Sequence, residues 1–362
     1  MNLPTQQLHT LGQRLWLDNI SRPLLRSGTL ARYIAELSIT GLTSNPTIFE
    51  KAIGASDAYD ANIRSLNAAG LVGETLFFEL ALKDLTEAAE LFRPIFEASD
   101  GADGWVSLEV SPLLADNTAH TVRAASQLFN HAGLSNLFIK IPGTPEGLRA
   151  IEEVIFDGVP VNVTLLFSRE QVVAAAEAYM RGIERRLDAG LALRVESVAS
   201  LFVSRWDTAV KIEIDKSFHN RLGIAMAMRC YRAHCEMLAS DRWQRLAAAG
   251  ARPQRLLWAS TGIKDLAAPD TLYVEALAAP NTINTLPEKT LLAFAEHGRL
   301  GAPMLANGGY ADAVLEEFRR EGVDDAALAD RLQREGVESF ATSWHALLTR
   351  IGEKCGQVHK QR

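Results

Sequence analysis

One lysine lies inside an apolar run in the middle of the chain. Lys140 has apolar residues on both sides in the segment LFIKIPGTPEGL. A low-dielectric interior disfavours an ammonium group, and the neutral amine that it favours is a nucleophile. Such an amine can form a Schiff base with a ketone, which then accepts electrons while a carbon–carbon bond breaks. The alternative for Lys140 is a side chain that packs its stem on apolar neighbours and extends its ammonium group to water.

Turn-forming residues follow two of the apolar runs. Pro142 and Gly143 come shortly after Lys140. They predict that the run ends there, and that a helix begins near Glu146. In the segment GLTSNPTIF, Asn45 precedes a proline that ends an earlier run. Its amide is suited to bind a substrate hydroxyl; the alternative is an amide that satisfies only the backbone of the turn.

Eight short apolar runs have the length of β-strands and must position these groups. Between most of them lie segments such as 74–92 and 169–188, with apolar residues at the three- and four-residue steps of a helix. A strand followed by a helix, repeated eight times, predicts a (β/α)8 TIM barrel of parallel strands, an α/β fold. The expected strands are 14–19, 39–44, 105–110, 137–141, 161–166, 193–198, 255–260 and 282–286.

Polar residues lie near or just past the carboxyl ends of several of these runs. In a barrel, the loops at that end converge to form the active site. We therefore expect the polar residues to share one rim. They are Asp18, Asn45, Glu109, Lys140, Thr164 and Ser200.

The length of 362 residues allows either one large barrel or two ordinary domains. No linker, repeat or low-complexity segment divides the chain, which favours a single barrel domain over residues 1–362. Two regions exceed a minimal barrel, around 206–246 and 324–352. The first predicts two helices with a break near His219, and the second predicts two further helices. Whether they cap a barrel face or make a subunit contact stays open.

The charge balance is mildly acidic, with 37 Lys and Arg against 44 Asp and Glu and a formal charge of −7. It excludes a broadly basic surface for nucleic acids or anionic membranes, so an anionic substrate needs a local basic pocket. Three cysteines without CxxC spacing favour a reducing compartment. The sequence shows neither a secretion signal nor an apolar stretch long enough to cross a bilayer. We therefore expect a cytoplasmic protein.

The two turn-containing segments resemble the signature segments of the transaldolase family. GLTSNPTIF and LFIKIPGTPEGL match in the family's order and on the expected strands. This family consists of class I Schiff-base aldolases on a (β/α)8 barrel. The chain length and the long segment after the sixth strand resemble its longer bacterial subgroup. The resemblance implies a transferase of the pentose phosphate pathway.

The resemblance implies catalytic roles for four residues. It makes Lys140 the Schiff-base lysine, and it makes Asp18, in LWLDNIS, the base that takes a proton from the sugar hydroxyl during cleavage. Glu109 would relay protons through a water that Thr164 positions. Each of the other three has an ordinary alternative: a helix N-cap for Asp18, a simple ion pair with lysine for Glu109, and a plain strand residue for Thr164.

Further residues are implied to bind the substrate. Asn45 and Ser200 would contact its hydroxyl groups. Arg205 would bind the sugar phosphate, because a guanidinium matches phosphate oxygens bidentately. The alternative for Arg205 is an ion pair with Asp207.

The chain departs from the family at the seventh strand. A second phosphate-binding arginine usually follows Ala-Ser there, whereas this chain has the segment WASTGIK. Lys264 would replace that arginine as a point charge, with Ser260 and loop amides helping.

The implied reaction passes a dihydroxyacetone unit from a ketose phosphate to an aldose phosphate. The donor would be sedoheptulose 7-phosphate or fructose 6-phosphate, and the acceptor erythrose 4-phosphate or glyceraldehyde 3-phosphate. No dinucleotide, P-loop, HExxH or paired CxxC motif occurs, so no metal or nucleotide cofactor is expected. We expect phosphorylated sugars as the binding partners, and neither nucleic acid nor membrane. A monomer and a homodimer both stay open.

Two other functions compete with this one. A fructose-6-phosphate-type aldolase of the same superfamily would release the three-carbon unit to water, but such relatives tend to carry Gln where Glu109 stands and Tyr where Phe202 stands. A non-catalytic barrel that only binds a partner would be marked by loss of the lysine or of a carboxylate. Lys140, Asp18 and Glu109 are all present, which favours the transferase.

Overall fold

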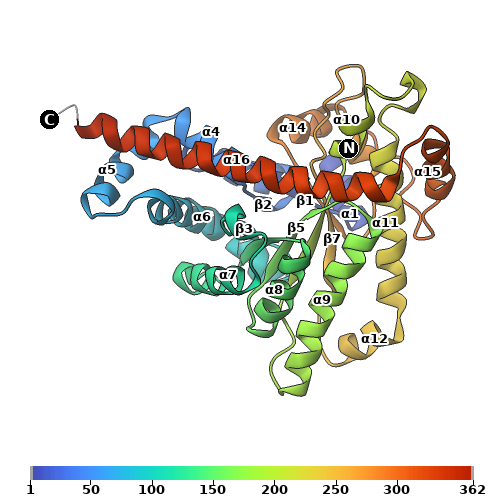
Figure 1. Cartoon of the computed structure of the whole chain (residues 1–362), viewed down its shortest axis with the longest axis horizontal. Coiled ribbons are helices and arrows are strands. Elements are labelled where there is room, and N and C mark those ends of the chain that lie inside the picture. The colour runs from blue at the N-terminus through green and yellow to red at the C-terminus, as the bar shows by residue number, and fades with distance from the viewer. Residues whose placement is uncertain (1–2, 360–362) are drawn as a thin grey trace.

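Eight parallel strands form the centre of the computed structural model, which describes residues 3–359 (Figure 1). Their spatial order is β2-β1-β8-β7-β6-β5-β4-β3, and a bridge between Gly41 and Trp105 joins the two ends. The predicted (β/α)8 barrel is therefore confirmed. The strands are β1 (Arg14–Asp18), β2 (Ile39–Thr43), β3 (Val106–Glu109), β4 (Leu137–Pro142), β5 (Val161–Leu166), β6 (Ser197–Phe202), β7 (Arg255–Ala259) and β8 (Thr282–Leu286).

Helices surround the strands and extend beyond them at one end (Figure 1). Those that pack on the strands include α3 (Thr29–Leu37), α6 (Gly73–Ala98), α7 (Thr118–Ala132), α8 (Pro145–Phe156), α9 (Arg169–Asp188), α11 (Leu222–Ala239) and α14 (Glu288–His297). The remaining α-helices are α1 (Pro4–Leu11), α2 (Arg22–Arg26), α4 (Pro46–Gly54), α5 (Asp60–Ala68), α10 (Ser204–Val210), α12 (Asp241–Ala248), α13 (Leu272–Ala276), α15 (Ala311–Arg320) and α16 (Asp325–His359). Within residues 3–359, no helix has both the length and the apolar character needed to span a membrane.

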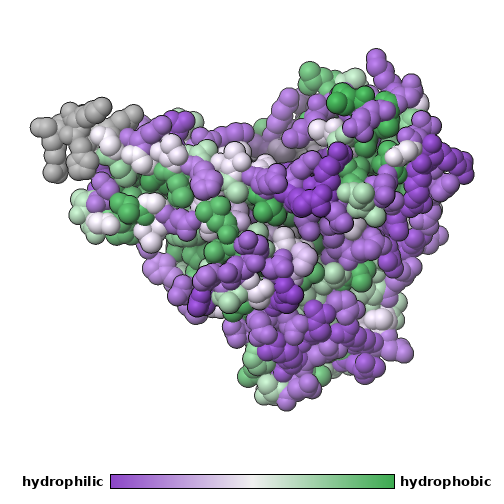
Figure 2. Space-filling model, in the orientation of Figure 1, coloured by the Kyte–Doolittle hydropathy of each residue, from purple (hydrophilic) through white to green (hydrophobic). Residues whose placement is uncertain are grey.

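The strands are buried on both faces. Every residue of β2, β3, β4, β5, β6 and β8 is buried, as expected for parallel strands covered by helices. The visible outer surface is mostly hydrophilic, with hydrophobic residues showing mainly near α5 and α6 and near α10 (Figure 2).

Because the strands are buried, a polar side chain inside the barrel must find a partner or face a cavity, since burying it unpaired costs free energy.

Helices begin almost directly after the strands that carry the predicted site. Thr144 caps α8, accepting a hydrogen bond from the Gly147 amide at 3.1 Å, and Pro145 occupies the first helical turn. Ser168 caps α9 in the same way, with Gln171 completing a capping box. The short connections hold the strand ends in place at one rim of the barrel.

The prediction for the sixth strand was wrong. The expected strand was 193–198, whereas β6 is Ser197–Phe202. Leu193 and Val195 are buried, but they lie in the loop that leads into the strand. Their apolar character reflects burial, while strand pairing starts only at Ser197 opposite Val161 of β5 and at Val198 opposite Arg255 of β7. Ser200 consequently lies within the strand and not after it.

The two regions beyond a minimal barrel also differ from expectation. The first contains three helices, α10, α11 and α12, because Ser240 ends α11 and caps α12. The break expected near His219 falls between α10 and α11. The second region, expected as two helices, is the single 35-residue helix α16. This helix runs across one end of the barrel and packs on α4, α5 and α6 (Figure 1).

Candidate active site

A cavity of about 360 Å³ opens at the carboxyl ends of the strands. Eight of the nine residues predicted for the site line it, and the ninth, Glu109, contacts Lys140 directly. The eight are Asp18, Asn45, Lys140, Thr164, Ser200, Arg205, Ser260 and Lys264. They come from six strands or from the loops and helices that follow those strands.

Lys140 is buried in this cavity. It is the fourth residue of β4 and is 5% exposed. Its Nζ donates a hydrogen bond to the backbone oxygen of Ser44 at 2.8 Å and lies 3.3 Å from Oε2 of Glu109. The alternative in which the ammonium group reaches bulk water is therefore not what the structure shows. The amine is fixed where a ketone in the cavity can meet it.

Glu109 is the last residue of β3 and is 4% exposed. Burial raises the pKa of its carboxyl, and the neighbouring Lys140 opposes part of that rise. The contact with Lys140 is consistent with the alternative, in which Glu109 only forms an ion pair with the lysine. It is equally consistent with a carboxyl that exchanges protons near the amine. A carboxyl with a raised pKa is better able to hold a proton close to neutral pH.

Asp18 ends β1 and faces the same cavity. Burial raises the pKa of its carboxyl, while a hydrogen bond from Thr43 and the charge of Lys140 lower it; the Thr43 Oγ1 to Asp18 Oδ1 distance is 2.8 Å. The helix N-cap alternative is wrong, because Ser21 caps α2 by accepting from the Leu24 amide. Asp18 is thus available to a ligand in the cavity.

Thr164 and Ser200 lie on the neighbouring strands β5 and β6. The Thr164 hydroxyl is buried and has no hydrogen-bond partner within the described part of the chain. A buried hydroxyl without a protein partner is suited to hold a water or a ligand atom. Ser200 donates to Oδ1 of Asn162 at 2.7 Å, and the Asn162 amide contacts Ser107 at 3.4 Å. These contacts orient the polar side chains of the barrel interior.

Asn45 has a structural role and a place in the cavity at once. Its Oδ1 accepts a hydrogen bond from the Ile48 amide at 3.0 Å and so caps α4. The alternative in which the Asn45 side chain satisfies the backbone of the turn is therefore correct for its oxygen atom. Because the cap uses the carbonyl oxygen, the amide nitrogen at the cavity stays available to a substrate oxygen.

Arg205 is the second residue of α10 and lines the cavity beside two aromatic rings. Its guanidinium carbon lies 5.3 Å from the ring centre of Phe202 and 6.0 Å from that of Phe340. The expected alternative, an ion pair with Asp207, is wrong. The Asp207 carboxylate instead accepts hydrogen bonds from the Leu222 and Gly223 amides and from the Tyr273 hydroxyl.

Ser260 and Lys264 follow β7 in a loop at the same cavity. Ser260 adopts a left-handed conformation with φ of 55°, which turns the chain sharply after the strand. Its hydroxyl lies 3.0 Å from that of Ser204, next to Arg205. Lys264 is exposed, so its ammonium group can approach a bound anion. Ser260 and Lys264 therefore line the same cavity as Arg205, and their role in phosphate binding stays a prediction.

Several residues of the cavity were missed by sequence reasoning. Thr43, Asn162 and Thr285 are polar residues in fully buried strands, as Lys140 is, but other polar residues in the same strands made this signal weaker. Lys51 on α4 and Phe340 on α16 carry no such signal, because neither follows a strand end directly.

Known proteins resemble the chain over nearly its whole length. Residues 15–351 match the family described as Transaldolase/Fructose-6-phosphate aldolase. A Transaldolase of Thermobifida fusca is 45% identical, with 98% of this chain and 99% of that protein covered. A Transaldolase of Thiobacillus denitrificans is 46% identical, with 97% and 100% covered, and one of Frankia alni is 42% identical, with 99% of both covered.

Proposed function

The chain belongs to the transaldolase/fructose-6-phosphate aldolase family, and we propose that it is a transaldolase acting through a Schiff base on Lys140. It transfers a dihydroxyacetone unit from a ketose phosphate to an aldose phosphate. One observation carries this proposal. The Lys140 amine lies buried in the cavity 3.3 Å from Glu109, and the carboxylate of Asp18 lines the same cavity.

The first step joins the donor to the enzyme. The unprotonated Lys140 amine attacks the ketone carbon of the donor, and the resulting carbinolamine loses its hydroxyl group as water to give an iminium ion. Glu109 supplies the proton for that departure and recovers one in the reverse direction. A water held by the unpartnered Thr164 hydroxyl would carry the proton between the carboxyl and the substrate oxygen.

The second step breaks a carbon–carbon bond. The hydroxyl that reacts lies on the carbon of the breaking bond that becomes the aldehyde carbon, and Asp18 takes its proton. The electron pair of the bond then moves to the iminium ion, and an aldose phosphate leaves. Because burial raises the pKa of Asp18, its carboxylate is a stronger base than an exposed one. The enamine left on Lys140 then attacks the aldehyde carbon of the acceptor, and the same steps in reverse release the new ketose.

The phosphate group of either sugar would bind where Arg205, Ser260 and Lys264 line the cavity. Arg205 offers a planar guanidinium without an ion-pair partner within 4.0 Å among residues 3–359. Ser260 and Lys264 lie on the same cavity and supply a hydroxyl and a mobile charge. The positive charges of Arg205 and Lys264 would attract an anionic substrate even though the net charge of the protein is negative. Asn45 and Ser200 would contact the sugar hydroxyls.

Transfer is favoured over release to water as the outcome. Glu109 and Phe202 both occur in the form that the resemblance associates with transferases, and Phe202 lines the cavity. A barrel that only binds a partner would not need a buried lysine held against a carboxyl, since breaking water contacts of both groups costs free energy.

Borohydride trapping tests the proposal. Treatment with fructose 6-phosphate and borohydride should reduce the iminium ion to a stable amine, and mass spectrometry should place the added mass on the Lys140 peptide. Lys51→Ala removes another lysine of the same cavity, one with no assigned role, and should leave the adduct intact. Lys140→Ala should abolish both the adduct and transfer to erythrose 4-phosphate. An unmodified Lys140 peptide in the native enzyme would refute the Schiff base.

We also propose one barrel domain and a cytoplasmic location. Residues of α16 line the same cavity as residues of β1, which argues for one folding unit. Cys230, Cys235 and Cys355 are free thiols, as expected in a reducing compartment.

A further inference from the structure

One face of α16 lies against the mouth of the barrel. Four residues on this helix follow one another at steps of three, four and three, which places them on the same face. Each of them contacts, or comes close to, a group at the rim of the cavity. They are Gln333, Gly336, Phe340 and Ser343.

The first half of this face is held closely on the barrel. Nε2 of Gln333 donates hydrogen bonds to the backbone oxygens of Gly143 and Leu165, both at 3.0 Å. Gly143 directly follows β4, which carries Lys140, and Leu165 belongs to β5, which carries Thr164. A Cβ atom added at Gly336 would lie 2.8 Å from Cδ2 of Leu165 and 3.5 Å from Nη1 of Arg205. A glycine is therefore what lets α16 come this close.

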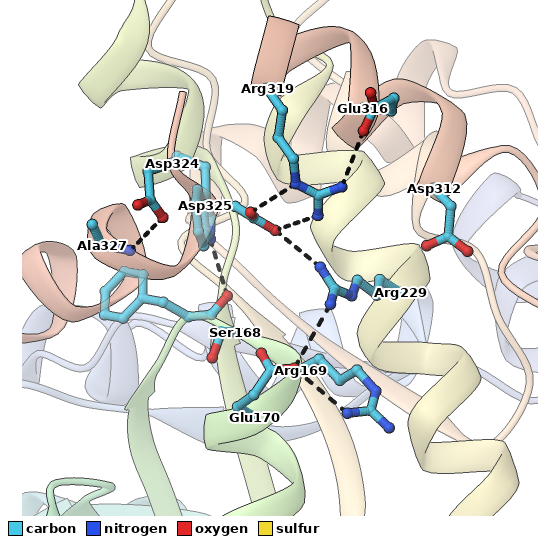
Figure 3. Close-up of polar contacts among 12 residues, drawn as sticks. Ser168, Arg169, Glu170, Arg229, Asp312, Glu316, Arg319, Asp324, Asp325 and Ala327 are labelled. Atoms are coloured by element: carbon cyan, nitrogen blue, oxygen red, sulfur yellow. Dashed lines mark hydrogen bonds and ion pairs between the residues drawn. The ribbon is translucent and has the colours of Figure 1, made fainter. Parts of the chain in front are cut away.

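Contacts on either side of Phe340 fix the position of this part of the helix. In Figure 3, Asp325 in its first turn accepts bonds from Arg229 of α11 and Arg319 of α15. The distances are 2.9 Å to Arg229 Nη1 and 3.0 Å to Arg319 Nη2. One turn after Phe340, the Ser343 hydroxyl lies 2.8 Å from that of Thr47 on α4, which lines the cavity. The residues between these contacts are held over the cavity mouth.

Phe340 is the side chain that this arrangement inserts into the cavity. It is 6% exposed, and its ring centre lies 5.9 Å from Nζ of Lys140 and 6.0 Å from Cζ of Arg205. Its ring also packs near that of Phe202, with 6.4 Å between centres. A sugar bonded to Lys140 with its phosphate on Arg205 must pass along this ring.

We propose that Phe340 is a specificity-determining residue that favours transfer to an aldehyde over release to water. The inference rests on the proposed function. The enamine on Lys140 has two fates. It can attack an acceptor aldehyde, forming a carbon–carbon bond. Alternatively, its carbon takes a proton from water, the iminium ion adds water, and the carbon–nitrogen bond breaks to free dihydroxyacetone and the amine. Protonation of the enamine carbon is the one step that only the second fate requires. The apolar ring beside Lys140 donates no proton and keeps water away from that carbon, while the water that hydrolyses the iminium ion serves both fates.

The test measures both products of one donor. Enzyme is given fructose 6-phosphate with erythrose 4-phosphate, and dihydroxyacetone and sedoheptulose 7-phosphate are quantified. Phe340→Ala should raise the ratio of released to transferred unit about tenfold, since it admits water at the enamine. Phe340→Leu keeps an apolar side chain and should raise the ratio less, about threefold.

A matched control separates this role from loss of packing. Phe318 on α15 is also buried and packs on Phe218, but it does not line the cavity. Phe318→Ala should therefore leave the ratio unchanged. If Phe340→Ala does not fold, Phe340→Leu decides by the same ratio.

Borohydride trapping of Lys140 distinguishes the two ways of failing. A native enzyme without the Lys140 adduct refutes the proposed function itself. An enzyme that forms the adduct, and whose Phe340 variants keep the native ratio within twofold, overturns only the role of Phe340.

Discussion

Asp207 lies two residues after Arg205 on α10 and is a buried carboxylate that should make stability depend on pH. Its oxygens accept hydrogen bonds from the Leu222 and Gly223 amides at 2.9 and 3.2 Å and from the Tyr273 hydroxyl at 2.7 Å. Burial nevertheless dominates and raises the pKa of Asp207 from 3.8 to about 6. These hydrogen bonds, and the nearby His219, oppose the rise only in part.

The sign and size of the effect follow from linkage. The folded state holds the proton of Asp207 more tightly than the unfolded state, so its contribution to stability is present in full below pH 3.8 and is lost as pH rises through about 6. A pKa difference of that size corresponds to about 3 kcal/mol. Roughly half of the loss, about 1.4 kcal/mol, should fall between pH 5 and pH 8.

The assay is urea unfolding of the native protein and of Asp207→Asn at pH 5 and pH 8. Asparagine does not titrate, so its altered hydrogen bonds with Leu222, Gly223 and Tyr273 add an offset that is independent of pH. The free energy of unfolding of the native protein minus that of the variant should fall by about 1.4 kcal/mol from pH 5 to pH 8. Other titrating groups cancel in this difference. A difference that stays constant, or that grows with pH, would refute the reasoning.

Three further predictions concern the cavity. Glu109→Ala should slow formation of the borohydride-trapped adduct about a hundredfold, because a methyl group cannot relay a proton; an unchanged trapping rate would contradict that role. Thr164→Val keeps the side-chain shape and should slow adduct formation about tenfold, because it removes the hydroxyl proposed to hold the relaying water. Arg205→Lys should raise KM for fructose 6-phosphate about tenfold and leave kcat nearly unchanged, because a point charge replaces a bidentate contact. An unchanged KM would show that the phosphate binds elsewhere.

Much of the site could be predicted because its residues break a local pattern. A polar residue in a buried apolar strand must have a partner or face a cavity, and Lys140 shows this pattern most clearly. The position of β4 in the barrel then fixes its neighbours: Glu109 lies directly opposite Lys140 in the parallel register of β3 and β4. Short-range signals in the sequence thus mark which residues belong to the cavity, while the register that places Glu109 beside Lys140 comes from the pairing of β3 with β4.

Other features depend on contacts between distant parts of the chain. Leu193 and Val195 are as apolar as strand residues, and only the pairing of β6 with β5 and β7 shows that the strand begins later, at Ser197. The role of Asp207 could not be read from its spacing to Arg205, because its partners on α11 and α13 come together only in the folded protein. Sequence proximity suggested an ion pair that the fold does not make.

Gly336 shows why the residues beyond a minimal barrel belong to the site. In an exposed helix, a glycine costs about 1 kcal/mol relative to alanine and favours a helix end, which is consistent with an expectation of two tail helices. Here α16 continues through the glycine. The glycine is needed because a side chain at this position would collide with Leu165 and come close to Arg205. The same close approach brings Phe340 to within 6.0 Å of Arg205. The glycine that weakens the helix locally is thus what allows the helix to form a wall of the cavity.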